Sequence, residues 1–327
     1  MSANPSIGDR FEDLVAQGKV KIAAEFIDGH TLSKLFHYIS QTVGGGNLLF
    51  NEAGIRFSES NKGVTLLNCF SIEACNLTFY HYAHDLPVFC FGFTSSDLRN
   101  ITKLTKKNES LRLFFHVDYP HLIIDHVSPK KEAGGGGYSF VSPVSLELFE
   151  YDVDGYSRGE QDANCTTTVT EFVDWAKHVL SIKASVINIE AHHKGFLFNS
   201  CFGGGKIGNS RPFGVIGRSP ESGAAPLSPA TPSVSEPGAF IPPLTPSLSE
   251  ASTETSDSHP QISIIPDTVK ALTHIRGIGS AKAILRMYME DETPLKIVVK
   301  IGNYGELKIY LWDYRTKRAA PAGATRA

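Results

Sequence analysis

Near the C-terminus, residues 294–312 read Pro-Leu-Lys-Ile-Val-Val-Lys-Ile-Gly-Asn-Tyr-Gly-Glu-Leu-Lys-Ile-Tyr-Leu-Trp. The runs 295–301 and 306–312 are rich in Val, Ile, Leu and Tyr, and a short segment with Gly302 and Asn303 separates them. Branched and aromatic side chains favour strands, whereas Gly and Asn mark turns. This stretch therefore predicts two consecutive strands.

Similar strand-like runs, bounded by Gly, Asn, Asp or Pro, occur along most of the chain. We predict further strands at 20–27, 48–57, 64–72, 88–93, 111–117, 121–127, 144–151, 185–190, 195–202, 261–265 and 283–289.

Four other segments have apolar residues at the 3.6-residue period of an amphipathic helix. They span 28–43, 95–107, 170–181 and 267–277. Their apolar stripes are Leu32, Leu35, Phe36, Ile39 and Val43; Leu98, Ile101 and Leu104; Phe172, Trp175, Ala176 and Val179; and Val269, Leu272 and Ile275. A strand precedes each helix and several strands follow it. This fourfold repeat predicts an α+β protein whose helices cover one face of antiparallel sheets.

Composition excludes several classes of protein. The 327 residues suffice for about two domains. A formal net charge of −3 with 20% charged residues is unlike a basic chromatin protein or an acidic disordered one. No apolar run approaches the roughly 18 residues of a membrane span, so we expect no membrane contact. Five scattered cysteines without a C-x-x-C pair argue against a zinc cluster or a disulfide framework.

Residues 217–260 stand apart, with nine of the eighteen prolines, ten serines and a single basic residue, Arg218. Such a segment cannot bury enough apolar area to offset the entropy of ordering it. Because strand-like sequence resumes afterwards, we expect a disordered insertion within a domain. Shorter flexible stretches are expected at Gly134–Gly137 and after Lys317.

The polar faces of the four predicted helices carry eight bases and five acids, so they are net positive in a net negative chain. Most of these acids lie near a helix start, where the helix dipole favours them. On the first helix His30, Lys34, His37 and Gln41 form one polar stripe. Two interpretations stay open. The faces are ordinary solvated surfaces, or they converge on a polyanion such as DNA, held through few phosphate contacts.

The two strands at 294–311 resemble the last hairpin of the proliferating cell nuclear antigen, the sliding clamp of eukaryotic and archaeal type replication. Leu148–Asp154 is similar to the clamp's entry into its interdomain connecting loop, and Gly54–Val64 to the strand and turn after its first helix. The resemblance is nearly colinear from about residue 20 to 316, at low identity.

The resemblance implies two similar domains that share a curved sheet, and three subunits that close a ring lined by the helices. The first domain would span 19–150 and the second 164–316, joined by a connecting loop at 151–163. Residues 1–18 would form a flexible extension and 317–327 a flexible tail.

The resemblance also implies site residues. The inner surface would present Lys34, Arg99, Lys103, Lys107, Lys177 and Lys270 to phosphates, although Asp174 lies where the clamp usually carries a base. A hydrophobic pocket for partner proteins would involve Ser60, Val64, Tyr156, Arg158, Pro294, Tyr310 and Trp312. Pro294 and Tyr310 match the family. Ser60, Tyr156 and Arg158 depart from it, which puts use of the usual partner motif in doubt.

The implied function is a DNA sliding clamp, a non-enzymatic processivity factor without a cofactor. It would be a nuclear homotrimer that encircles double-stranded DNA, tethers DNA polymerase and repair proteins, and is loaded by an ATP-dependent clamp loader. Two alternatives within the fold are a subunit of a checkpoint-type heterotrimer and a viral subunit that does not close a ring.

Three other motifs suggest different chemistry. Residues 272–285, with Gly277-Ile278-Gly279, resemble a helix-hairpin-helix of DNA repair proteins, which would make 280–290 a second helix; we favour the strand at 283–289. Gly203-Gly204-Gly205-Lys206 lacks the Ser or Thr and the spacing of a phosphate loop. His192-His193 lacks a third ligand at zinc spacing, so we expect a polar hairpin and no metal site.

Overall fold

The computed structural model describes residues 11–127, 137–146, 149–150, 163–203, 205–216, 259–278, 282–315 and 325–326. The predicted insertion at 217–260, except for its last two residues, and the connecting loop at 151–163, except for Ala163, lie outside this part of the chain. No helix within it is long and apolar enough to cross a membrane.

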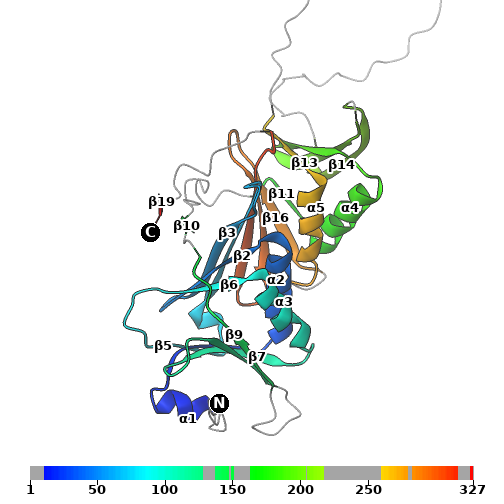
Figure 1. Cartoon of the computed structure of the whole chain (residues 1–327). Helices are drawn as coiled ribbons and strands as arrows, with labels where there is room; N and C mark the ends of the chain where they lie inside the picture. The colour runs from blue at the N-terminus through cyan, green and yellow to red at the C-terminus, as the bar shows by residue number, and fades with distance from the viewer. Residues whose placement is uncertain are drawn as a thin grey trace, which may run out of the picture.

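An eight-stranded antiparallel sheet runs through the middle of the molecule (Figure 1). Its strand order is β11-β16-β17-β18-β4-β3-β2-β6. The first half of the chain supplies β2 (Gly45–Asn51), β3 (Gly54–Ser60), β4 (Leu66–Glu73) and β6 (Phe89–Thr94). The second half supplies β11 (Cys165–Thr168), β16 (Ile284–Tyr288), β17 (Leu295–Ile301) and β18 (Gly305–Leu311). The halves join where β18 pairs with β4, from Gly305 opposite Ile72 to Leu311 opposite Leu66.

Smaller antiparallel sheets lie at the two ends of the molecule (Figure 1). One has the order β5 (Phe79–Tyr82), β1 (Val20–Phe26), β7 (Ser110–His116), β8 (Leu122–Val127), β9 (Gly137–Val141). The other has the order β14 (Ile207–Val215), β13 (Lys194–Cys201), β12 (Val186–His192), β15 (Gln261–Ile264). A short pair joins β10 (Phe149–Glu150) to β19 (Thr325–Arg326).

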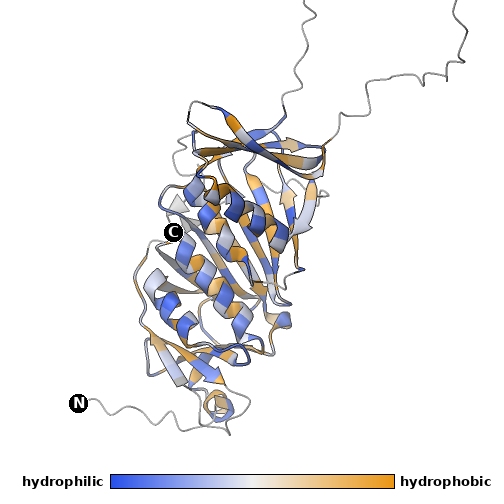
Figure 2. Ribbon diagram, turned by 90° about the vertical axis from the view of Figure 1, so that its right-hand side faces the viewer, coloured by the Kyte–Doolittle hydropathy of each residue, from blue (hydrophilic) through white to orange (hydrophobic). Residues whose placement is uncertain are grey.

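Four helices lie side by side over one face of the central sheet (Figure 2). They are α2 (Gly29–Thr42), α3 (Ser95–Leu104), α4 (Val169–Ser181) and α5 (Pro266–Leu272), the last continued by a 3₁₀ turn, η3 (Thr273–Ile275). Side chains of Asp28, Thr94 and Thr168 cap the first three helices by accepting backbone N–H groups of the first turn. The apolar stripes pack on the inward residues of the sheet, such as Leu307, Ile309 and Leu311, to form one core.

The observed architecture confirms the predicted α+β class and the repeat. A helix followed by a hairpin occurs as α2 with β2 and β3, and again as α4 with β12 and β13. The strand prediction at 283–289 is also confirmed, because β16 pairs with β17 on one side and β11 on the other. The sequence that resembles a helix-hairpin-helix therefore continues as a strand.

Other expectations were wrong. Phe11–Ala16 form a helix, α1, instead of a flexible extension, because Phe11, Leu14 and Val15 share one face and pack on the five-stranded sheet. Leu104 was expected to belong to the apolar stripe of its helix. It is 56% exposed instead, because α3 ends at this residue.

Two strand predictions were also wrong in their bounds. The run 48–57 is not one strand but parts of the hairpin β2–β3. Among the described residues of 144–151, only Phe149–Glu150 form a strand; Val144 instead donates its N–H to the Gly92 carbonyl. Strands β5, β9 and β14 were not predicted at all.

A buried polar chain links α2 to the central sheet. The Tyr38 hydroxyl donates to Asn68 Oδ1 at 2.7 Å, and Asn68 Nδ2 donates to Thr42 Oγ1 at 3.0 Å. Neither Tyr38 nor Asn68 has access to water. If the Tyr38 hydroxyl were removed, Asn68 Oδ1 would lose its donor and no water could take its place. A buried amide oxygen without a partner destabilises the fold.

We predict that Tyr38→Phe lowers the free energy of unfolding by about 1–3 kcal/mol, the cost of an unsatisfied buried acceptor. Chemical denaturation of both proteins measures the difference. Tyr119→Phe removes a hydroxyl that is only half-buried and should change stability by less than about 0.5 kcal/mol. Equal effects of the two substitutions would contradict the assigned role of the Tyr38 hydroxyl.

Candidate nucleic-acid face and partner pocket

The solvent side of α2 is one narrow polar stripe. His30, Lys34, His37 and Gln41 are partly or fully exposed, as the sequence predicts, whereas most of the other residues of the helix are buried. The helix is therefore enclosed on three sides, by the sheet below it and by a helix on each flank.

Small side chains let the flanking helices approach α2 closely. Ser33 and Ser40 are buried, and the Ser33 hydroxyl donates to the Thr102 carbonyl of α3 at 3.4 Å. Arg99 of α3 donates to the Ser40 carbonyl at 3.2 Å. On the other flank α2 contacts α5 and η3, which in turn contact α4. The order across the layer is thus α3, α2, α5, α4.

This arrangement brings the six predicted phosphate-binding bases onto one surface, which we call the helix face. Lys34 is half-buried, and the other five are exposed. None of the six lies within 4.0 Å of a carboxylate of the described residues. The set consists of Lys34, Arg99, Lys103, Lys107, Lys177 and Lys270. Their charges are therefore available to an external anion.

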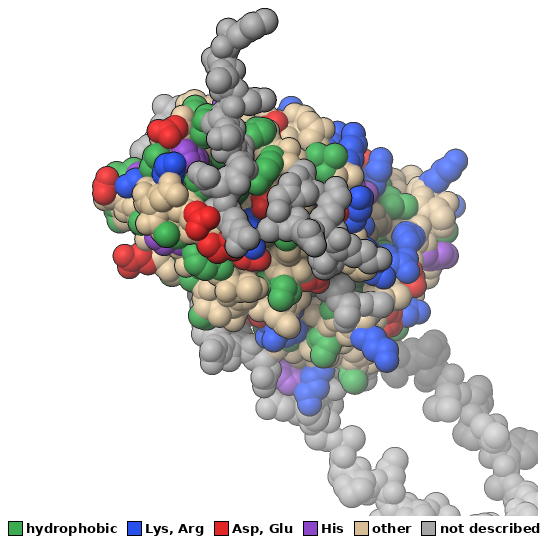
Figure 3. Space-filling model, turned by 90° about the horizontal axis from the view of Figure 1, so that it is seen from below, with side chains coloured by type: hydrophobic (Ala, Val, Ile, Leu, Met, Phe, Trp, Pro, Cys, Tyr) green, Lys and Arg blue, Asp and Glu red, His purple; other side chains and the backbone are tan. Residues whose placement is uncertain are grey.

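Acids in the four helix segments are fewer than bases, five against eight. Asp174 lies 4.0 Å from Arg276, so that its charge is partly compensated within the face. Seen from below, Lys and Arg gather on the side where Figure 1 draws the helices, and Asp and Glu are more frequent on the opposite side (Figure 3). The uneven distribution gives an acidic chain one basic surface.

Two histidines meet at the centre of the helix face. The rings of His37 on α2 and His274 on η3 lie edge to face, 5.5 Å apart between centroids. Burial lowers the pKa of His37 below its ordinary value, and Lys34 and Arg99 lower it further. Burial, His37 and Lys270 likewise lower the pKa of His274. The neighbouring cations thus disfavour a further positive charge in this region.

The residues predicted for a partner pocket lie on the other face of the central sheet, which we call the outer face. Here Leu67, Cys69, Tyr310 and Trp312 form a small apolar cluster. The sheet register places Ser60 opposite Leu67 and Leu67 opposite Tyr310. These side chains therefore share one row across β3, β4 and β18.

Tyr310 is not an open wall of a cavity, since only 1% of its surface is exposed. Pro294 and Trp312 are also buried, Val64 lies half-buried in the turn before β4, and Tyr156 and Arg158 lie outside the described residues. The structure therefore brings together part of the predicted set and packs it closely.

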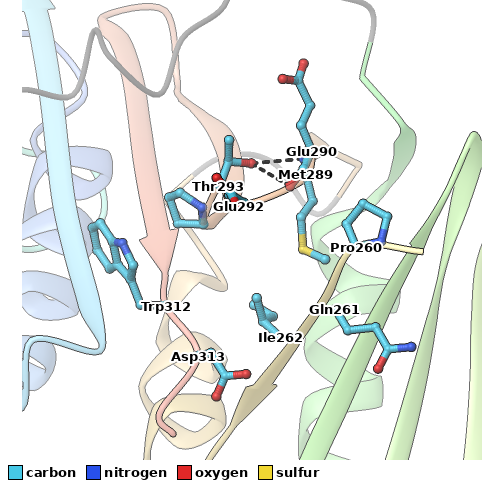
Figure 4. Close-up of a pocket in the computed structure, with 10 residues that line it drawn as sticks. Pro260, Gln261, Ile262, Met289, Glu290, Glu292, Thr293, Trp312 and Asp313 are labelled. Atoms are coloured by element: carbon cyan, nitrogen blue, oxygen red, sulfur yellow. Dashed lines mark hydrogen bonds between the residues drawn. The ribbon is translucent and has the colours of Figure 1, made fainter. Parts of the chain in front are cut away.

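A cavity of about 160 Å³ opens beside this cluster (Figure 4). Trp312 and Met289 lie on opposite sides of it, and Pro294, Ile262 and Asp313 also line it. The remaining walls are Pro260, Gln261, Glu290, Glu292 and Thr293. The lining mixes apolar side chains with the carboxylates of Glu290, Glu292 and Asp313, which suits a short apolar side chain with a polar or basic neighbour.

The pair His192-His193 lies at the turn of the hairpin β12–β13, as expected, and the fold also brings two potential metal ligands from elsewhere close to His192. Glu190 and His259 offer ligand atoms that, with one of His192, all lie within 4.8 Å of one another. His259 follows the long segment 217–258 in sequence, so no short motif spacing could have revealed it.

We predict that the His37/His274 pair makes the fold less stable in mild acid. Because both pKa values are lowered in the folded state, the unfolded chain binds more protons below about pH 6.5, and stability falls as the pH drops through that range. Replacing both residues by Gln should reduce the loss of unfolding free energy between about pH 7 and pH 5.5. His193→Gln, at an exposed turn, is the control; an unchanged pH dependence in the double variant would contradict the prediction.

Comparison with known proteins bears on this geometry. No family model matches the sequence, and no curated protein matches it. Among solved structures, the crystal structure of proliferating cellular nuclear antigen from Entamoeba histolytica matches with a TM-score of 0.63 and 12% sequence identity, over 90% of this chain and 98% of that chain. A likeness at this identity shows the fold alone: the chain has the fold of the sliding clamp.

Proposed function

We propose that the chain is a subunit of a DNA sliding clamp, a non-enzymatic ring that holds replication and repair proteins on duplex DNA. The observation that carries this proposal is the helix face. Five of its six bases lie on α2, α3, α4 and α5, and Lys107 follows the end of α3; none of the six has an ion-pair partner among the described residues. Such bases suit phosphates of any sequence, because a Lys or Arg contact with the backbone carries no base information.

A ring is supported by two bare sheet edges at opposite ends of the molecule. Within the described part of the chain, β9 ends one sheet and β14 ends another, and each pairs with one neighbouring strand (Figure 1). Phe140 on β9 and Ile207 on β14 are 54% and 62% exposed. Pairing of β9 of one subunit with β14 of the next is a head-to-tail contact, which closes into a ring when the rotation permits.

The outer face supports docking of partner proteins. The cavity between Pro294, Trp312 and Ile262 would receive a side chain of a polymerase or another clamp-binding protein. A separate ATP-dependent loader would open the ring, and the nucleus is the compartment that this function implies. A heterotrimer or an open viral form remains the alternative assembly, since both use the same fold.

We predict that reversing charge on the helix face weakens DNA binding. Lys103→Glu with Lys107→Glu should lower affinity for circular duplex DNA and reduce the slope of log affinity against log salt by about 2, one unit for each lost phosphate contact. A titration at several salt concentrations measures both quantities.

The matched control places the same change on the outer face, as Lys300→Glu with Lys308→Glu. It should leave the salt slope unchanged, since the even-numbered residues of β17 and β18 point away from the helices. If both double variants lose affinity equally, the helix face is not the DNA-binding surface.

We predict that a charge on either bare edge breaks the assembly. Phe140→Asp and Ile207→Asp should each convert a particle of about three 35.6 kDa chains into monomers, because the new carboxylate would lie unpaired in the contact between subunits. Light scattering after size exclusion measures the mass. Leu86→Asp, at an exposed position away from both edges, should remain trimeric. A monomeric wild type would reject the closed homotrimer.

A further inference from the structure

The end of β12 and the residue before β15 bring three potential metal ligands together. In the pairing of these strands Glu190 lies opposite Gln261, and the Ala191 N–H donates to the Pro260 carbonyl at 2.9 Å. Continuing that register by one residue places His192 opposite His259. Glu190 and His192 are two residues apart on β12, so their side chains project from the same side of this strand. The backbone alone therefore places all three side chains on one patch.

The side-chain geometry fits a small cation. His192 Nε2 lies 3.4 Å from Glu190 Oε1, and the rings of His192 and His259 are 4.5 Å apart between centroids. Two ligands bound at ~2.1 Å to a tetrahedral ion are about 3.4 Å from each other. The Glu190–His192 separation already equals the edge of such a tetrahedron, and a rotation of the exposed His259 would bring its nitrogen into place.

One polar atom here is not satisfied by the protein. His192 Nε2 is shielded from solvent and has no hydrogen-bond partner, although a carboxylate lies beside it. A buried ring nitrogen without a partner costs free energy, which a bound metal would recover.

We propose that Glu190, His192 and His259 form a zinc site with an open fourth position for water. Two imidazoles and one carboxylate are a ligand set that zinc accepts, whereas magnesium and calcium prefer oxygen ligands alone. The site differs from the helix face and from the partner cavity, and it does not depend on the proposed clamp function.

The position of the site gives the metal a structural role. His259 directly precedes Pro260 and Gln261, which line the cavity beside Trp312. Zinc would tie His259 to β12. Binding would therefore hold one wall of the cavity.

The test is metal binding by the tag-free full-length chain. Zn²⁺ titrated by calorimetry should bind one equivalent, and Co²⁺ in its place should give the visible absorption of a tetrahedral site. His259→Ala and Glu190→Gln should each weaken Zn²⁺ binding by about 100-fold or more, beyond the loss of an outer-sphere contact. His193→Ala is the matched control, because this neighbouring exposed histidine belongs to the turn and should bind Zn²⁺ as the wild type does.

A local readout separates metal binding from general damage. The Ala191 amide donates to Pro260, so its hydrogen exchange should slow when Zn²⁺ is added to the wild type and stay unchanged in His259→Ala. Far-UV circular dichroism confirms that each variant is folded. Wild-type protein that binds no Zn²⁺, or a His259→Ala variant with the affinity of His193→Ala, would overturn the proposal.

Discussion

The antiparallel pairing of β4 with β18 is the contact on which the rest of the structure depends. It joins the two halves of the chain into one sheet, so the helices of both halves are held over the same surface. Gly305 makes the pairing possible, since a Cβ there would lie 1.9 Å from the Ser71 carbonyl oxygen. The turn before β18 also positions α2, because the Tyr304 hydroxyl accepts the N–H of Asp28, the helix cap. One strand pair thus sets the order of the whole helix layer.

The charge distribution follows from that layer. Bases late in the helices turn outward together, and Glu171 at the start of α4 is matched by Arg211 at 3.0 Å. The chain as a whole is acidic, so attraction for an anion is local to the helix face and is screened over roughly 10 Å at 0.1 M salt. On such a surface, contacts with an anion are weak and exchange readily, and tight fixed contacts are not favoured.

Sequence patterns predicted the structural features that depend on neighbouring residues along the chain. They missed the features that depend on residues far away in the sequence. The stripe of His30, Lys34, His37 and Gln41 was found because helical spacing alone determines it. β14 was missed because Pro212 and its glycines are poor strand formers, which only an edge strand tolerates. The closeness of His259 to His192 could not be predicted, since a pairing across the long segment creates it. The burial of Tyr310 likewise depends on Leu67, which the neighbouring strand β4 supplies.

The bare edges of β9 and β14 also matter for the newly made chain. An unpaired strand that displays Phe140 or Ile207 is a template on which any extended segment can add, including a misfolded copy. A chain whose two edges stay unpaired is therefore prone to aggregate, and covering either edge would lower that tendency.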